Sequence, residues 1–102
     1  MKKICYECGE GWFPLIEEAQ AIVDQYNKDH PNLEYPIEFT QIKEKWGYLN
    51  LYLNYYTDVL HDKILEISNK SRSICEMCGK PAKSFSKHGW VYTLCEECKE
   101  NV

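Results

Sequence analysis

Cys75-Glu76-Met77-Cys78 and Cys95-Glu96-Glu97-Cys98 are two CxxC pairs, with residues 79–94 between them. Each pair places two sulfurs on one side of a tight turn, close enough together to share a metal ion. The segment between the pairs must then fold back to bring the second pair opposite the first. Cys75, Cys78, Cys95 and Cys98 are therefore predicted to be the ligands of one tetrahedral Zn²⁺ site.

Turn residues within 74–102 predict how this zinc-binding module folds. Cys75–Gly79 forms a knuckle, residues 82–87 and 90–93 pair as a hairpin across His88-Gly89, and Cys95 opens a short terminal helix. The N–H groups at a helix start stabilise sulfur anions. Knuckle, hairpin and helix in this order are typical of a treble-clef arrangement, and a zinc ribbon is the close alternative. Because the module is too small for a core of its own, the metal supplies stability on the order of 10 kcal/mol.

Residues 1–73 are predicted to form an α-β-β-α body that begins with a second CxxC knuckle, and the module is predicted to pack on it. Apolar residues recur every three or four positions after Pro14, which predicts a helix that ends near Asn27–Asp29. Thr57 or Asp58 caps a second helix, which buries Leu60, Ile64 and Ile67. Residues 68–73 form a polar exit into the module. The fold class is α+β.

Two strands between these helices are predicted to pair as a hairpin across Trp46-Gly47. In the first, residues 37, 39 and 41 alternate with residues 38, 40 and 42, and the second spans residues 48–56. In the second strand Leu49, Leu51, Leu53 and Tyr55 face the first helix. The opposite face carries Tyr48, Asn50, Tyr52, Asn54 and Tyr56.

The tyrosine-asparagine stripe is a candidate partner-binding surface. If the hairpin is covered on one side only, these rings and amides are open to water and suit contact with a protein, or stacking on bases. The alternative is that the stripe packs against the second helix or the module, as part of a two-sided core. Trp12 and Trp90, each directly after a glycine, are predicted to anchor the core.

Cys5 and Cys8 make only half of a metal site, because no further CxxC pair remains to complete it. A second site would need His30 or His61, or a second copy of the chain that donates its own Cys5 and Cys8 in a homodimer. The alternative is a pair of free, partly buried thiols. The spacing leaves these alternatives open.

Composition and charge place further limits on the class of protein. The 102 residues contain no apolar run near the roughly 20 residues that cross a bilayer, and the Met1-Lys2-Lys3 start is not a secretory pattern. The chain is therefore expected to be cytoplasmic, without a membrane partner. Thiols stay reduced in that compartment, which favours metal ligation over the alternative of a secreted disulfide scaffold.

The net charge of −4 is unevenly distributed along the chain. Acids exceed bases in residues 1–65, whereas the segment 70–88 is basic and contains Lys70, Arg72, Lys80, Lys83 and Lys87. These residues could contact nucleic acid, with Trp90 or Tyr92 stacking on bases. Alternatively, they offset the −2 charge of a zinc ion with four thiolates.

The sequence predicts no enzymatic activity. It contains no H-x-E motif beside the cysteines, no legible Ser-His-Asp set and no phosphate-binding glycine loop. Acids inside the CxxC pairs oppose thiolate formation without a metal, which disfavours a redox dithiol. Four sulfurs also close the coordination sphere, so a structural role is expected for the metal.

Four segments occur in an order that resembles a family of small phage and prophage proteins. These proteins pair a GW-initiated helix and a QIKEK-type hairpin with a terminal CxxC module. The matching segments are residues 8–16, 41–47, 75–81 and 89–95. The chain departs from the family at Gly47-Tyr48, where Gly-Gly is common, and at Cys5, which adds a thiol to what is more often a lone Cys8.

The resemblance implies a phage origin and supplies no catalytic residues. Small, acidic phage proteins often bind host machinery, including restriction, CRISPR and other defence systems, and this analogy suggests the same here. The leading hypothesis is therefore a non-enzymatic, zinc-stabilised protein that docks on a host protein. It would use the tyrosine-asparagine stripe or the acidic first helix, which contains Glu17, Glu18 and Asp24. The alternative is a nucleic-acid-binding module that uses the segment 70–88.

Overall fold

The computed structural model describes residues 4–102 and has the predicted α+β class. Its elements, in chain order, are β1 (Tyr6–Glu7), the 3₁₀ turn η1 (Glu10–Trp12), α1 (Phe13–Asp29), β2 (Phe39–Lys45), β3 (Tyr48–Leu53), α2 (Asp58–Ser71), β4 (Lys83–Lys87), β5 (Trp90–Leu94) and α3 (Glu96–Lys99). The molecule is elongated, with extents of 49 × 24 × 22 Å.

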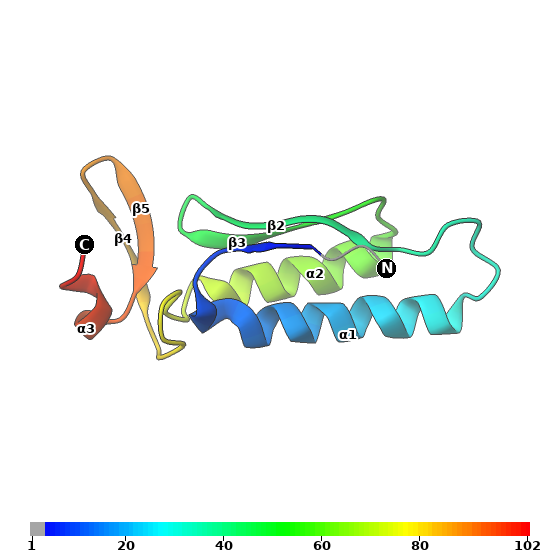
Figure 1. Cartoon of the computed structure of the whole chain (residues 1–102), viewed down its shortest axis with the longest axis horizontal. Coiled ribbons are helices and arrows are strands. Elements are labelled where there is room, and N and C mark those ends of the chain that lie inside the picture. Colours follow the sequence, from blue (N-terminus) through cyan, green and yellow to red (C-terminus); the bar gives the residue numbers. More distant parts are fainter. Residues whose placement is uncertain (1–3) are drawn as a thin grey trace.

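Two lobes lie end to end along the long axis (Figure 1). In the larger lobe, α1 and α2 lie side by side against one face of the sheet β1-β2-β3. In the smaller lobe, the hairpin β4-β5 and the short α3 follow the knuckle at residues 75–79. The larger core lies between the helix layer and the sheet, and a smaller cluster is centred on Cys75, Leu94 and Cys95.

The helices form where the apolar spacing predicts them. Pro14 lies in the first turn of α1, and the Thr57 hydroxyl accepts a hydrogen bond from the Leu60 N–H at the start of α2. Residues 68–73 were predicted to be a polar connection to the module. This is wrong for residues 68–71, because α2 continues to Ser71. Ser71 is buried, and its hydroxyl accepts a hydrogen bond from the N–H of Leu49 at 2.9 Å. A polar residue thus sits inside the core with its hydrogen bonds made.

The sheet differs from the expected simple hairpin in two ways. β1 pairs in parallel with β2, with Tyr6 opposite Ile42, where the sequence suggested only a knuckle. A β-bulge between Phe39 and Gln41 inserts Thr40 as an extra residue in β2. The predicted alternation is therefore wrong after the bulge, and Phe39 and Ile42 are both buried.

The second strand is shorter than expected and ends at Leu53. The Asn54 side chain bonds back to residues 36 and 38, and its Oδ1 accepts from the Glu38 N–H at 3.1 Å. The Tyr56 hydroxyl donates to the Leu51 carbonyl at 2.7 Å and accepts from the Leu53 N–H at 3.1 Å. Tyr56 and Ser71 thus satisfy outward backbone groups of β3, the last strand of the sheet order, which protects this edge against pairing with other chains. Tyr55, expected beside the leucines, is exposed.

The two lobes are joined by direct backbone contacts between the N-terminal segment and the knuckle. The Gly11 N–H donates to the Glu76 carbonyl at 2.7 Å, and the Gly9 N–H donates to the Glu76 carboxylate at 3.0 Å. The indole Nε1 of Trp12 donates to the Ile74 carbonyl at 2.8 Å. Trp12 is fully buried, so its predicted role as a core anchor is confirmed.

A second joint links the tip of the β2-β3 hairpin to β5. The Thr93 hydroxyl donates to the Gly47 carbonyl, and a Cβ on Gly47 would lie 2.6 Å from Val91 Cγ1. Gly47 also has a φ of +79°, which favours glycine. The smaller lobe is therefore held on the body at two separated places.

The first joint predicts that Gly11→Ala is strongly destabilising. A Cβ at Gly11 would lie 2.0 Å from the Cys75 carbonyl oxygen and 2.6 Å from that of Glu76, so the segments must separate. We expect a loss of at least about 2 kcal/mol from overpacking and the lost hydrogen bond. In thermal unfolding followed by circular dichroism, this lowers the Tm by roughly 8–16 °C.

Gly89→Ala is the matched control for this substitution. Gly89 has a φ of +83°, but no atom lies within 4 Å of the place that a Cβ would occupy. Alanine there therefore costs only the left-handed backbone penalty of about 1–2 kcal/mol. Equal Tm values for wild type and Gly11→Ala would contradict the close backbone contact.

Candidate metal centre

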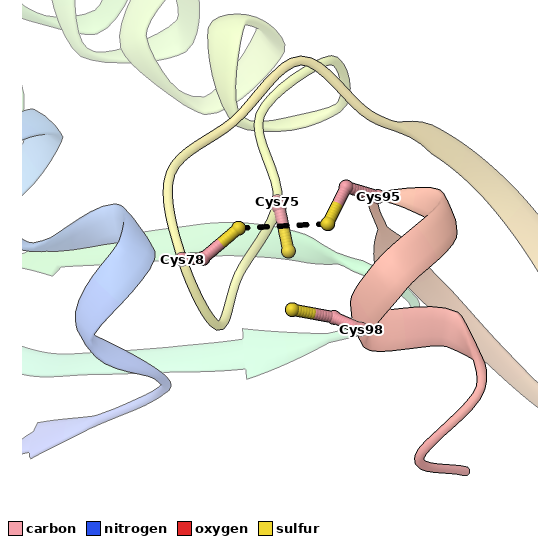
Figure 2. A group of neighbouring side chains, drawn as sticks. All are labelled: Cys75, Cys78, Cys95 and Cys98. Carbon is pink, nitrogen blue, oxygen red and sulfur yellow. Dashed lines mark hydrogen bonds between the residues drawn. The ribbon is translucent and has the colours of Figure 1, made fainter.

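Four cysteine sulfurs converge between the knuckle and α3 (Figure 2). Cys75 and Cys78 come from the knuckle, and Cys95 and Cys98 come from the start of α3. All four Sγ atoms lie within 4.8 Å of one another, and those of Cys78 and Cys95 are 3.5 Å apart. The structure therefore brings together the complete set of predicted C-terminal metal ligands.

Backbone hydrogen bonds fix the positions of the ligands. The Cys75 N–H donates to the Lys80 carbonyl at 2.7 Å, and the Gly79 N–H donates to the Cys75 carbonyl at 2.9 Å. Gly79 has a φ of +84°, which the tight turn requires. Cys95 is the N-cap of α3, where its carbonyl accepts from the Lys99 N–H. The Glu76 N–H donates to the Thr93 carbonyl, which ties the knuckle to β5.

The sulfur positions fit a single tetrahedral metal ion. A metal–sulfur bond of about 2.3 Å in tetrahedral geometry separates the sulfurs by roughly 3.8 Å. A polynuclear cluster would need more room than four sulfurs within 4.8 Å leave. Four sulfur ligands also fill a tetrahedral coordination sphere, so no position is left for substrate or water. The cysteine cluster can therefore bind a metal ion in a closed site.

The electrostatics of the thiols also favour a bound cation. Burial raises the pKa of Cys75, but N–H groups of Cys95, Cys78 and Met77 outweigh this effect and lower it to about 6. The side chain of Cys95, with burial, raises the pKa of Cys98 to about 12. The Cys75 thiol therefore loses its proton readily, whereas the neighbouring cysteines oppose deprotonation of Cys98. A metal ion removes this opposition because it replaces the thiol protons.

The N-terminal pair lies apart from this cluster. Cys5 is exposed, and Cys8 is half-buried against the core of the body. Within residues 4–102, the cluster of Cys75, Cys78, Cys95 and Cys98 is the one group of three or more side chains placed to hold a metal. His30 instead stacks on Tyr26, and His61 contacts Tyr56 edge-on. Completion by a second copy of the chain stays a prediction.

The tyrosine-asparagine stripe is divided by the end of β3. Tyr48, Asn50 and Tyr52 lie on the outer face of the sheet, opposite Lys45, Lys43 and Gln41 of β2. Both helices lie on the other face (Figure 1). Asn54 and Tyr56 come after the strand, where they make the backbone hydrogen bonds that end it. The outer face therefore presents three of the five predicted partner-binding residues.

Most of the basic residues of segment 70–88 contact other groups of the chain. Lys70 pairs with Glu18 at 2.8 Å, and Lys80 pairs with Glu97 at 3.3 Å. The Arg72 guanidinium lies 3.9 Å from the centre of the Tyr48 ring, and Lys87 donates to the Val102 carbonyl. Lys83 is exposed at the start of β4. Four of the five side chains thus already have partners within the chain.

The sequence interpretation missed a cleft lined by two tryptophans. Trp90 was predicted to anchor the core, but this is wrong, because 66% of its surface is exposed. It opens β5 directly after the His88-Gly89 turn and lines a cleft of about 310 Å³ with Trp46. Trp46 is also 66% exposed. The two Trp residues beside turn glycines are the sequence signal that could have indicated the cleft.

Comparisons of the chain with protein-family models, curated proteins and solved structures gave no match. In the part of the chain described here, no helix combines the length and apolarity needed to cross a membrane.

The cysteine cluster predicts one tightly bound metal ion per chain. Cys98→Ser removes one ligand, so the variant should lose the ion to a chelator and melt at least about 10 °C below the loaded protein. Cys5→Ser is the matched control and should keep the ion and the Tm. Elemental analysis after gel filtration measures the stoichiometry. A metal-free wild type with the same Tm before and after chelation would contradict the site.

Cys8 should be a slowly reacting thiol. Burial, together with Glu76 and Glu44, raises its pKa to about 11. The neutral thiol therefore persists to high pH, and alkylation should accelerate about tenfold per pH unit until pH ~11. In the metal-loaded protein at pH ~8, mass spectrometry should find exposed Cys5 labelled roughly 100-fold faster than Cys8. Equal labelling of the two would contradict this environment, whereas protection of both would show a second metal site.

Proposed function

We propose that the chain is a non-enzymatic, zinc-stabilised binding protein that contacts host machinery, and that the smaller lobe is a treble-clef type of structural zinc site. The observation that carries this proposal is the closed set of four sulfurs, since a catalytic zinc keeps an open coordination position. Zinc is the proposed ion because it favours four thiolates in tetrahedral geometry. The order of knuckle, β4-β5 and α3 supports the treble-clef assignment over a zinc ribbon.

The proposed contact surface is the outer face of the sheet β1-β2-β3. Tyr48, Asn50 and Tyr52 present rigid rings and an amide on this face. Amphipathic rings of this kind are enriched at protein interfaces and cost little side-chain entropy on binding. The edge backbone of β3 is satisfied by Tyr56 and Ser71, so the face rather than the edge is available.

In this proposal the chain is a phage protein that acts by binding a host protein, and the zinc ion keeps its contact surface rigid. The resemblance to small phage proteins supports a role in the host cytoplasm, including inhibition of a defence system. A host protein is the first class of partner, in keeping with the aromatic face. The acidic residues of α1, Glu17, Glu18 and Asp24, are all exposed, and they provide a second surface for a protein contact. Glu18 also pairs with Lys70.

The proposal predicts retention of a host component that depends on the outer face. Zinc-loaded protein, tagged at its N-terminus, should capture that component from host lysate. Tyr52→Thr, which keeps the strand preference but removes the ring, should reduce capture by about tenfold, the effect of losing an interface aromatic. Quantitative mass spectrometry measures the captured material.

Leu65→Ala is the matched control for this experiment. Leu65 is exposed on α2, in the layer opposite the outer face, and its truncation should leave capture unchanged. Capture that is equal for wild type and Tyr52→Thr would contradict the proposed surface. Absence of any retained host component would contradict the proposed function.

A further inference from the structure

The outer face of the sheet carries positive charge in an otherwise acidic chain. The outward residues of β2 and β3 form three cross-strand pairs: Gln41 with Tyr52, Lys43 with Asn50, and Lys45 with Tyr48. These six residues comprise two lysines, two tyrosines and two amides, without an acid. The net charge of the chain is −4, so its acidic excess lies elsewhere. Glu7 of β1 also lies on this face, opposite Lys43, and its carboxylate accepts a hydrogen bond from the Gln41 amide. With Glu7 included, the face keeps a net positive charge from Lys43 and Lys45.

A third positive charge reaches this face from the end of α2. The Arg72 guanidinium lies 3.9 Å from the centre of the Tyr48 ring, in cation–π geometry. Lys43, Lys45 and Arg72 thus surround the rings of the outer face with positive charge. A face that combines basic groups with flat rings is better matched to the phosphates and bases of a nucleic acid than to a partner protein with a neutral surface.

The tryptophan cleft continues this face past the tip of the β2-β3 hairpin. Lys45 belongs to the outer face and also lines the cleft, together with Trp46 and Trp90. Glu44, the one acid in the lining, has its carboxylate bonded to the Gly47 N–H at 2.9 Å. The cleft therefore offers two largely exposed indole rings beside a lysine.

The two indoles are held on rigid supports. Each hairpin tip has two consecutive residues with positive φ: Trp46 and Gly47 in one turn, and His88 and Gly89 in the other. This is the type I′ pattern of tight hairpins. The bond from Thr93 to Gly47 holds the β2-β3 tip against β5, the strand that Trp90 opens, so the cleft exists before any ligand binds. A preformed site loses less entropy on binding.

We propose that the outer face and the tryptophan cleft together bind single-stranded nucleic acid. This inference rests on the proposed contact surface and goes beyond the proposed function, because it adds single-stranded nucleic acid as a ligand of the face that is proposed to contact a host protein. Bases stack on Trp46, Trp90 and Tyr52, and phosphates pair with Lys43, Lys45 and Arg72. Stacking requires unpaired bases with open ring faces, so a duplex is not a ligand for this surface. The basic residues that bind are those of the sheet face and Arg72, not the rest of segment 70–88.

The direct test measures the binding of fluorescent oligo-dT and oligo-U of roughly ten nucleotides to the zinc-loaded protein by fluorescence anisotropy. We expect binding to both single strands, quenching of tryptophan emission, and no comparable binding to a duplex of the same length. With three phosphate contacts, log K should fall with log salt at a slope of about −2. Lys45→Ala should reduce this slope by about 0.7.

The indole variants are chosen to preserve the fold. Trp46→Asn retains a residue that accepts the left-handed backbone at φ +60°, and Trp90→Thr retains strand preference in β5. Each should weaken binding by about tenfold or more. Tyr35→Ala and Lys63→Ala are matched controls at exposed positions away from the outer face, and both should bind as wild type. Metal content and circular dichroism confirm that each variant is folded.

Three outcomes would overturn the inference: no binding to single strands, equal binding to the duplex, or wild-type affinity in both indole variants. If oligonucleotides fail to bind while Tyr52→Thr still loses a nuclease-resistant host protein, the partner of this face is a protein. In that case the inference is wrong and the proposed function stands. If host capture also fails, both are wrong.

Discussion

The contact between the N-terminal glycines and the cysteine knuckle is the constraint on which the rest of the structure depends. Gly11 approaches the Cys75 and Glu76 carbonyls so closely that a side chain has no room, and the Gly11 N–H bonds to Glu76 at 2.7 Å. The backbone at Gly11 can pack this closely on the backbone of Cys75 and Glu76 only if the knuckle has one fixed conformation. The four sulfurs can bind one metal ion, and this ligation would provide that shape, because the knuckle is too short to have a core of its own.

This joint fixes the two small lobes relative to each other, as the proposed binding surface requires. It anchors Trp12 in the body core, while the second joint at Gly47 holds the β2-β3 tip against β5. The aromatic and basic residues of the outer face then lie next to the tryptophan cleft, on elements that do not need to rearrange. In the proposed function, a structural metal would thereby contribute to binding without touching the ligand. Such pre-organisation is how a chain of this size can offer a defined contact surface.

Periodicity and motif spacing predicted the helices, both hairpins and the four clustered cysteines, since these features depend on local sequence. Contacts between distant segments were not predictable in this way. The bulge at Thr40 turns the Ile42 side chain from the predicted outer face of the sheet to the inner face. The bulge is defined by the register between β2 and β3, which the sequence of β2 alone does not contain. Ser71 is polar, so the sequence predicts that it is exposed. It is buried in the core because its hydroxyl accepts a hydrogen bond from the Leu49 N–H. Trp90 follows a glycine as Trp12 does, yet one ring is exposed and the other buried, because the lobes meet at Trp12.

Hydrogen exchange, measured by NMR on the loaded and the chelated protein, tests most directly whether the metal holds the two lobes together. We expect the Gly11 amide and the Trp12 indole N–H to be protected in the loaded protein and to lose that protection on chelation. Amides within the β2-β3 ladder should stay protected, because their hydrogen bonds lie within the body. Unchanged protection of Gly11 and Trp12 after complete metal removal would contradict the central claim.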